Sequence, residues 1–201
     1  MFATCLCARF QAYPKDSHLL AVKRIFRYLK STKNLGLWYQ KNSGFDLVAY
    51  TDSDYGGCKI DRKSTSGSCQ FLKGKLVIWP SKKQNYVSTS TPEVEYMDAA
   101  SCCSQVMWMR NQLRDYGLDI DKIPILCDSK SAIAISANPV QHSKTKHIDI
   151  RYHFLKHHVE QGTIKMYFVS TDYHLVDLFT KALDEKIFSF LVGKLGKLNL
   201  S

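Results

Sequence analysis

Apolar residues recur along the chain at two spacings, which predict alternating strands and helices. Steps of three and four residues predict helices over 17–33, 92–115, 129–136, 147–162, 170–183 and 184–196. Short apolar runs predict strands in the segments LGLWYQ, FDLVAYT, SCQFL, KLVIW, IPILC and IKMYFV. A meander of about four strands, followed by strands that alternate with helices, indicates an α/β fold with a mixed sheet flanked by helices.

Three acidic residues fall where these predicted elements meet. Asp52 directly follows FDLVAYT, Asp128 directly follows IPILC, and Asp177 lies near the start of the helix at 170–183. Ligands of such sheets gather where strands end, so these side chains are candidates for one shared site. Taken singly, Asp52 is also typical of a turn and Asp128 of a helix cap.

A fourth acid, Glu95, interrupts the apolar face of a helix. It precedes by four residues a stripe at helical spacing that comprises Ala99, Cys102, Val106, Met109 and Leu113. A carboxylate on the face that packs on the sheet costs several kcal/mol unless a partner compensates it. Glu95 therefore favours a functional interpretation, whereas Asp98 on the same helix is interpreted as a solvated surface charge.

Four clustered carboxylates would need cations, because like charges in proximity raise one another's pKa values. Their hard oxygen ligands suit Mg²⁺ or Mn²⁺. Two such ions can clamp a phosphodiester, one activating the attacking water and the other stabilising the leaving oxygen. With a net charge of +10 and a pI of about 9.2, the chain favours a polyanionic partner. These properties indicate a nuclease.

Composition indicates one domain with a short extension in a reducing compartment. The 201 residues are 45% hydrophobic and include seven cysteines, an odd number with no C-x-x-C pair. No segment predicts a secretory signal or a membrane span. We therefore expect a cytosolic or nuclear protein with reduced thiols, neither secreted nor in a membrane.

Several segments together resemble one family. YTDSDYGG, DRKSTSG, SKKQNYVSTSTPEVEYMDAA, ILCDSKSAIAIS, TKHIDIRYHFL and LVDLFTKAL are similar to successive blocks of the ribonuclease H domain of copia-type LTR retrotransposon Pol polyproteins. Residues 1–44 resemble the segment that links the reverse transcriptase to that domain. The resemblance implies a ribonuclease H-like domain at 45–201, with a five-stranded mixed sheet, behind an N-terminal linking extension of a helix and a strand.

The resemblance also implies an activity. Cleavage of the RNA strand of RNA–DNA hybrids during reverse transcription would use two Mg²⁺ ions, with Mn²⁺ as a substitute. The implied partner is the reverse transcriptase of the same polyprotein, in a cytoplasmic retrotransposon particle or the nucleus. The catalytic residues and metal ligands would be Asp52, Glu95, Asp128 and Asp177. Val176 and Ala182 depart from the family, which usually has a small residue and a proline there.

Candidate nucleic-acid contacts lie in two polar segments, DRKSTSG and QHSKTKH, which otherwise fit ordinary polar loops. They are Arg62, Lys63, Ser64, Lys144, Lys146 and His147. His174, three residues before Asp177, is a candidate proton shuttle, with an exposed first-turn histidine as the alternative.

Two other functions stay open at this point. One is a catalytically silent remnant of the polyprotein that only binds nucleic acid. The other is a DNA-directed nuclease of the same fold.

Overall fold

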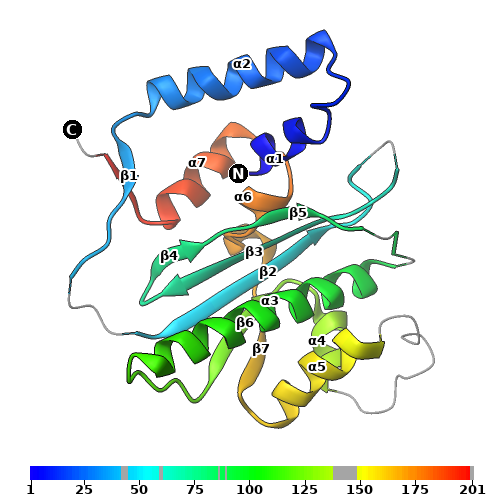
Figure 1. The fold of residues 1–201 in the computed structure, drawn as a ribbon, viewed down its shortest axis with the longest axis vertical. Coiled ribbons are helices and arrows are strands. Elements are labelled where there is room, and N and C mark those ends of the chain that lie inside the picture. The colour runs from blue at the N-terminus through cyan, green and yellow to red at the C-terminus, as the bar shows by residue number, and fades with distance from the viewer. Residues whose placement is uncertain (42–44, 59–60, 86, 89, 138–148, 200–201) are drawn as a thin grey trace.

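A computed structural model describes residues 1–41, 45–58, 61–85, 87–88, 90–137 and 149–199, and a mixed β-sheet forms its centre (Figure 1). The sheet contains β2 (Leu47–Asp54), β3 (Thr65–Leu72), β4 (Lys75–Ile78), β5 (Ser81–Lys83), β6 (Ile123–Cys127) and β7 (Ile164–Phe168). Five strands follow the order β4-β3-β2-β6-β7, and β5 pairs with β3 beside this path.

Strand direction divides the sheet into two halves. The β2–β3 and β3–β4 pairs are antiparallel, whereas the β2–β6 and β6–β7 pairs are parallel. The β3–β4 hairpin turns at Lys73 and Gly74, whose φ angles of 44° and 67° match the left-handed conformation that tight hairpins require. The parallel pairing places Cys127, the last residue of β6, beside Thr51 of β2, which brings Asp128 towards Asp52.

Helices cover both faces of the sheet. The α-helices in the described residues are α1 (Phe2–Ala8), α2 (Asp16–Ser31), α3 (Thr91–Asp115), α4 (Lys130–Ala137), α5 (Asp149–Glu160), α6 (Asp177–Thr180) and α7 (Glu185–Lys194). On one face α3, α4 and α5 bury a core that includes Val106, Ile125 and Leu155. On the other, α6 and α7 bury a second core around Phe71 and Leu191. The predicted α/β fold, a mixed sheet flanked by helices, is confirmed.

The first predicted strand is not part of the meander, which has three strands instead of about four. β1 (Leu35–Leu37) pairs antiparallel with β8 (Lys197–Asn199), a strand that the sequence did not predict. Residues 42–44, the predicted turn between the first two strands, lie outside the described residues. A three-residue strand near the chain's other end cannot be distinguished by spacing, since alternation needs several residues to register.

The prediction of one continuous helix at 170–183 is wrong, because only two short helical segments lie in this range. A 3₁₀ helix, η3 (Thr171–Tyr173), comes first, and α6 begins only at Asp177. His174 separates them in an extended conformation, with φ −82° and ψ 90°. Leu175 and Val176 then enter the second core, and this burial overrides the local helical spacing.

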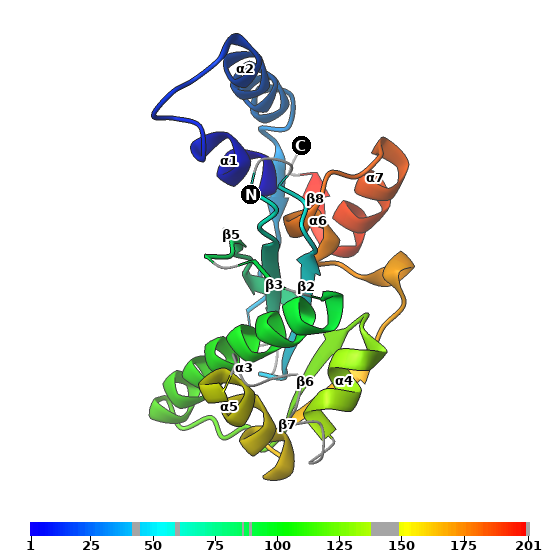
Figure 2. The same ribbon diagram turned by 90° about the vertical axis from the view of Figure 1, so that its right-hand side faces the viewer.

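Helix α2 stands apart from both cores. It lies with α1 at one end of the molecule, and α4 and α5 lie at the other (Figure 1 and Figure 2). None of its residues is buried, and Leu19, Phe26 and Leu29 are 53%, 65% and 55% exposed. Its one ring contact to the second half of the chain, among the residues described, joins Tyr28 to Phe188 at 6.2 Å. No helix in the described ranges has the length and apolar character needed to cross a membrane.

We expect core and extension to differ sharply in their contribution to stability. Leu155→Ala should lower the free energy of unfolding by about 2–5 kcal/mol, because it opens a cavity under α5. Phe26→Ala should change it by less than about 0.5 kcal/mol, because most of that ring is already in water. Urea denaturation of both variants checks this; a large loss in Phe26→Ala would show that α2 belongs to the core.

Candidate active site

Asp52 is the centre of a buried polar cluster. It lies in β2, is 1% exposed, and accepts a hydrogen bond from the Thr180 hydroxyl. The Lys181 ammonium lies 3.6 Å from its Oδ2 atom. Burial raises the pKa of Asp52, although Lys181 and Thr180 act in the opposite direction. The carboxylate is thus held in one orientation by two residues of the neighbouring α6 turn.

Gly67 allows α6 to come this close. It is the register partner of Asp52 on β3. A Cβ atom there would clash with Thr180 Cγ2, well inside van der Waals contact distance, and would lie 3.4 Å from Val176 Cγ2. The missing side chain therefore makes room for both residues. Val176 is fully buried and packs in the second core.

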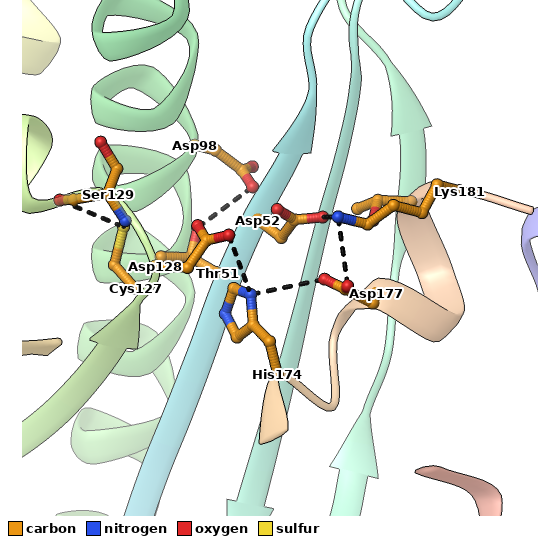
Figure 3. Close-up of polar contacts among 10 residues, drawn as sticks. Thr51, Asp52, Asp98, Cys127, Asp128, Ser129, His174, Asp177 and Lys181 are labelled. Carbon is orange, nitrogen blue, oxygen red and sulfur yellow. Dashed lines mark hydrogen bonds and ion pairs between the residues drawn. The ribbon is translucent and has the colours of Figure 1, made fainter. Parts of the chain in front are cut away.

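Asp177 and Lys181 form the α6 side of the cluster. They are four residues apart, and Lys181 Nζ lies 3.1 Å from Asp177 Oδ2, so the ammonium bridges Asp177 and Asp52 (Figure 3). Burial lowers the pKa of Lys181, but the two carboxylates outweigh it and the net shift is upward. Sequence reasoning missed Lys181, although its i,i+4 spacing from Asp177 was visible.

Glu95 points into the same region from α3. It is 4% exposed, and its Oε2 atom has no hydrogen-bond partner among the described residues. Burial, followed by the charges of Asp52 and Asp128, raises its pKa to about 10. Its ligand atom lies within 4.8 Å of those of Cys127 and Asp128.

His174 links Asp128 to Asp177. Its Nδ1 atom lies 3.8 Å from Asp128 Oδ2 and 3.4 Å from Asp177 Oδ1 (Figure 3). Its exposure is 0%, so the alternative of an exposed first-turn histidine is wrong. The buried side chains of Leu175 and Val176 pull this segment inward, which spacing alone does not reveal.

Asp98 is also buried, which corrects its interpretation as a surface charge. It is 3% exposed and accepts a hydrogen bond of 3.1 Å from the Thr51 hydroxyl. Burial raises its pKa well above the ordinary value, with Asp52 adding to the shift. Asp98 comes three residues after Glu95 and shares its inward face, a spacing that could have signalled burial. It borders an open pocket of about 240 Å³ that residues of β3, β5 and α3 line.

The predicted nucleic-acid contacts are placed only in part. Arg62 is exposed, with a φ of 56°. The hydroxyl of Ser64 is buried and accepts a hydrogen bond of 3.1 Å from the Gly56 backbone N–H, so it stabilises its own loop. Three further predicted contacts, Lys144, Lys146 and His147, lie outside the described residues. Lys63 and these others stay predictions.

The donor atoms of the cluster fit a hard divalent cation. Glu95 Oε2 and Asp177 Oδ1 are buried oxygens without hydrogen-bond partners in the described part of the chain. The ligand atoms of Asp52, Asp128 and His174 lie within 4.8 Å of one another. Carboxylate oxygens that lack donors are what Mg²⁺ or Mn²⁺ would bind. Burial raises the pKa of Cys127, so its thiol stays protonated and does not favour a soft metal.

Comparison with known proteins places the chain in a retrotransposon context. It is 37% identical over 196 residues to the retrovirus-related Pol polyprotein from transposon RE1 of Arabidopsis thaliana, and 35% identical over 196 residues to that from transposon RE2. Both alignments cover 97% of this chain. The chain is homologous to one segment of copia-type Pol polyproteins. It spans 13% and 14% of the length of these two relatives.

Other comparisons of this Pol homologue concern families and solved structures. No protein-family model matches it. The N-terminal ribonuclease H domain of rv2228c from Mycobacterium tuberculosis is 12% identical, with a TM-score of 0.49 over 75% of this chain and 98% of that one. The ribonuclease H-like fold predicted from the sequence agrees with the sheet itself, three antiparallel strands joined to two parallel ones.

The raised pKa of Glu95 in this Pol homologue predicts a pH-dependent effect of Glu95→Gln. Between its ordinary value of 4.5 and about 10, folded Glu95 binds a proton that the unfolded chain has released, so rising pH destabilises the folded chain. Glu95→Gln removes this pH-dependent loss of stability, because glutamine does not ionise. In EDTA, the variant's gain in Tm should grow from near zero at pH 4.5 to roughly 4–8 °C at pH 8.

The exposed Glu185 provides the control for that measurement, since Glu185→Gln should show no such trend. A gain for Glu95→Gln that is constant across pH would show that Glu95 is ionised in the metal-free chain.

Packing at Gly67 predicts a second effect. Gly67→Ala should lower the free energy of unfolding by about 1–3 kcal/mol, because the new methyl group pushes Thr180 and α6 away from β3. Gly193→Ala is the matched control, since a Cβ there meets nothing within 4 Å and improves helix propensity. Equal effects in thermal melts would contradict the close packing at Gly67.

Proposed function

We propose that this chain is a ribonuclease H that cleaves the RNA strand of RNA–DNA hybrids during retrotransposon reverse transcription. One observation carries the proposal: β2, α3, the end of β6 and α6 bring Asp52, Glu95, Asp128 and Asp177 into a single cluster, in which only Asp128 is partly exposed. Homology to Pol polyproteins over 97% of the chain supports the same conclusion.

The four carboxylates would hold two Mg²⁺ ions, for which Mn²⁺ could substitute. When bound, these ions would neutralise phosphate charge and acidify the attacking water. Glu95 Oε2 and Asp177 Oδ1 support this role, because each is a buried oxygen that accepts no hydrogen bond from a described residue, which is otherwise costly.

The chain's own residues orient the carboxylates and offset their negative charge. Thr180 donates to Asp52 and fixes the direction of its carboxylate, while Lys181 lies against Asp52 and Asp177. Burial of the Asp52 and Asp177 carboxylates keeps bulk water from them, so their electrostatic interactions are strong and need little reorganisation. The role of His174 as a proton shuttle stays a prediction.

The proposal that the substrate is an RNA–DNA hybrid rests on homology and on net charge. A net charge of +10 suits a nucleic acid, and contacts to 2′-hydroxyl groups would distinguish RNA from DNA. We propose that residues 1–44 link the domain at 45–201 to the reverse transcriptase of the same polyprotein, inside a retrotransposon particle.

A silent remnant is the less favoured alternative. Its main support in the sequence is Val176, but Gly67 accommodates this residue and the acids stay grouped. A DNA-directed nuclease would share the same cluster, so substrate comparison distinguishes it: duplex DNA should be cleaved far more slowly than hybrid.

Removing a single acid should abolish activity without unfolding the chain. We expect Asp52→Asn and Asp128→Asn each to lower the rate of hybrid cleavage in Mg²⁺ by about 10³-fold or more, because a charged ligand is lost. Both should remain folded, since each substitution relieves repulsion. Gel analysis of a hybrid with labelled RNA measures the rate.

Asp172→Asn, an exposed carboxylate in η3, is the matched control and should cleave like the wild type. Hybrid cleavage that persists in both active-site variants would refute the four-acid site. Absence of cleavage in the wild type would favour the silent alternative.

A further inference from the structure

We propose that His174 is a nitrogen ligand of the cation site and gives it a preference for Mn²⁺-like transition-metal ions over Mg²⁺. The inference rests on the proposed function only in placing cations among the four acids. It assigns a ligand that the four-acid set does not contain.

The first observation is an unsatisfied buried imidazole. His174 is fully buried, and neither ring nitrogen forms a hydrogen bond to any described residue. A buried polar group left without a partner costs about 1–3 kcal/mol, so such groups usually have a function or a missing ligand. The ring nitrogens need a partner, and the cluster is where Nδ1 points.

The second observation is the direction and distance of Nδ1. It faces Asp128 and Asp177, at 3.8 and 3.4 Å from their nearest oxygens (Figure 3). Both distances exceed the 2.7–3.2 Å of an N–H···O hydrogen bond. They fall within the roughly 3–4.2 Å that separates two ligand atoms each about 2.1 Å from one ion, depending on the angle between them at the ion. The arrangement therefore fits co-ligands better than donor and acceptor.

The third observation is that the backbone fixes this placement. The Asp177 N–H donates to the His174 carbonyl at 3.1 Å, which ties the histidine to the first residue of α6. On the other side, the His174 N–H donates to the Thr171 carbonyl at 3.1 Å. Leu175 and Val176 anchor the intervening segment in the second core. The imidazole is thus preorganised as firmly as the acids.

The chemistry of the donor then sets the metal preference. Imidazole binds transition-metal ions well, whereas Mg²⁺ prefers oxygen ligands only. Asp52 and Asp128 supply the oxygens beside His174, with all three ligand atoms within 4.8 Å. A mixed nitrogen and oxygen set selects Mn²⁺ relative to Mg²⁺ at this position.

The test measures metal binding without substrate, so its outcome is independent of cleavage. Mn²⁺ is added to the full chain, and electron spin echo envelope modulation detects nitrogen bound to it. Histidine labelled with ¹⁵N, in the wild-type chain, should change the modulation. This arm needs no variant, and a wild-type spectrum without histidine nitrogen would overturn the proposal.

A second arm identifies the residue. In His174→Gln the nitrogen modulation should disappear, and Mn²⁺ affinity by calorimetry should fall about tenfold or more, with Mg²⁺ affinity changing less than about threefold. His157→Gln, an exposed histidine on α5, is the control and should retain both. Modulation that persists in folded His174→Gln, or equal losses for the two metals, would overturn the assignment. Nitrogen ligation without hybrid cleavage would contradict the proposed function alone.

Discussion

Repulsion among buried carboxylates is the constraint around which this structure is arranged. Five acids, Asp52, Glu95, Asp98, Asp128 and Asp177, approach one another where the central strands end. Burial alone raises the pKa values of three of them, and their mutual charges raise these further. Such a group stays together only because surrounding residues oppose the repulsion and because hydrophobic burial elsewhere supplies the stability that the cluster consumes.

The two cores hold the cluster from opposite faces. Successive residues of β2 alternate sides, so Thr51 reaches Asp98 beneath α3 while Asp52 reaches Thr180 beneath α6. The first core fixes α3 and with it Glu95. The second fixes the four-residue helix α6, which is too short to be stable alone and depends on Gly67 for its close approach. Displacing either core would therefore separate acids that are distant in sequence.

Periodicity predicted much of this arrangement, and its failures have physical causes. α3, β6 and α7 follow long or clearly bounded apolar patterns, so they were predictable, as was the inward direction of Glu95. The segment around His174 was not predictable, because burying Leu175 and Val176 in the second core stabilises the chain more than a continuous helix would. β8 was missed because a strand of three residues is too short to show an alternation of apolar and polar positions. Asp98 was misjudged because a charged residue is usually solvated, and only its tertiary partner Thr51 shows otherwise.

Lys181 and Glu95 explain how the cluster can exist before any cation arrives. The Lys181 ammonium bridges Asp52 and Asp177, and its raised pKa keeps it charged. Glu95, with a pKa of about 10, keeps its proton at neutral pH and adds no charge. The acids are therefore already grouped when the chain folds. An incoming cation needs only to displace a proton and a bridging ammonium, so the free energy of assembling the site comes from folding rather than from substrate binding.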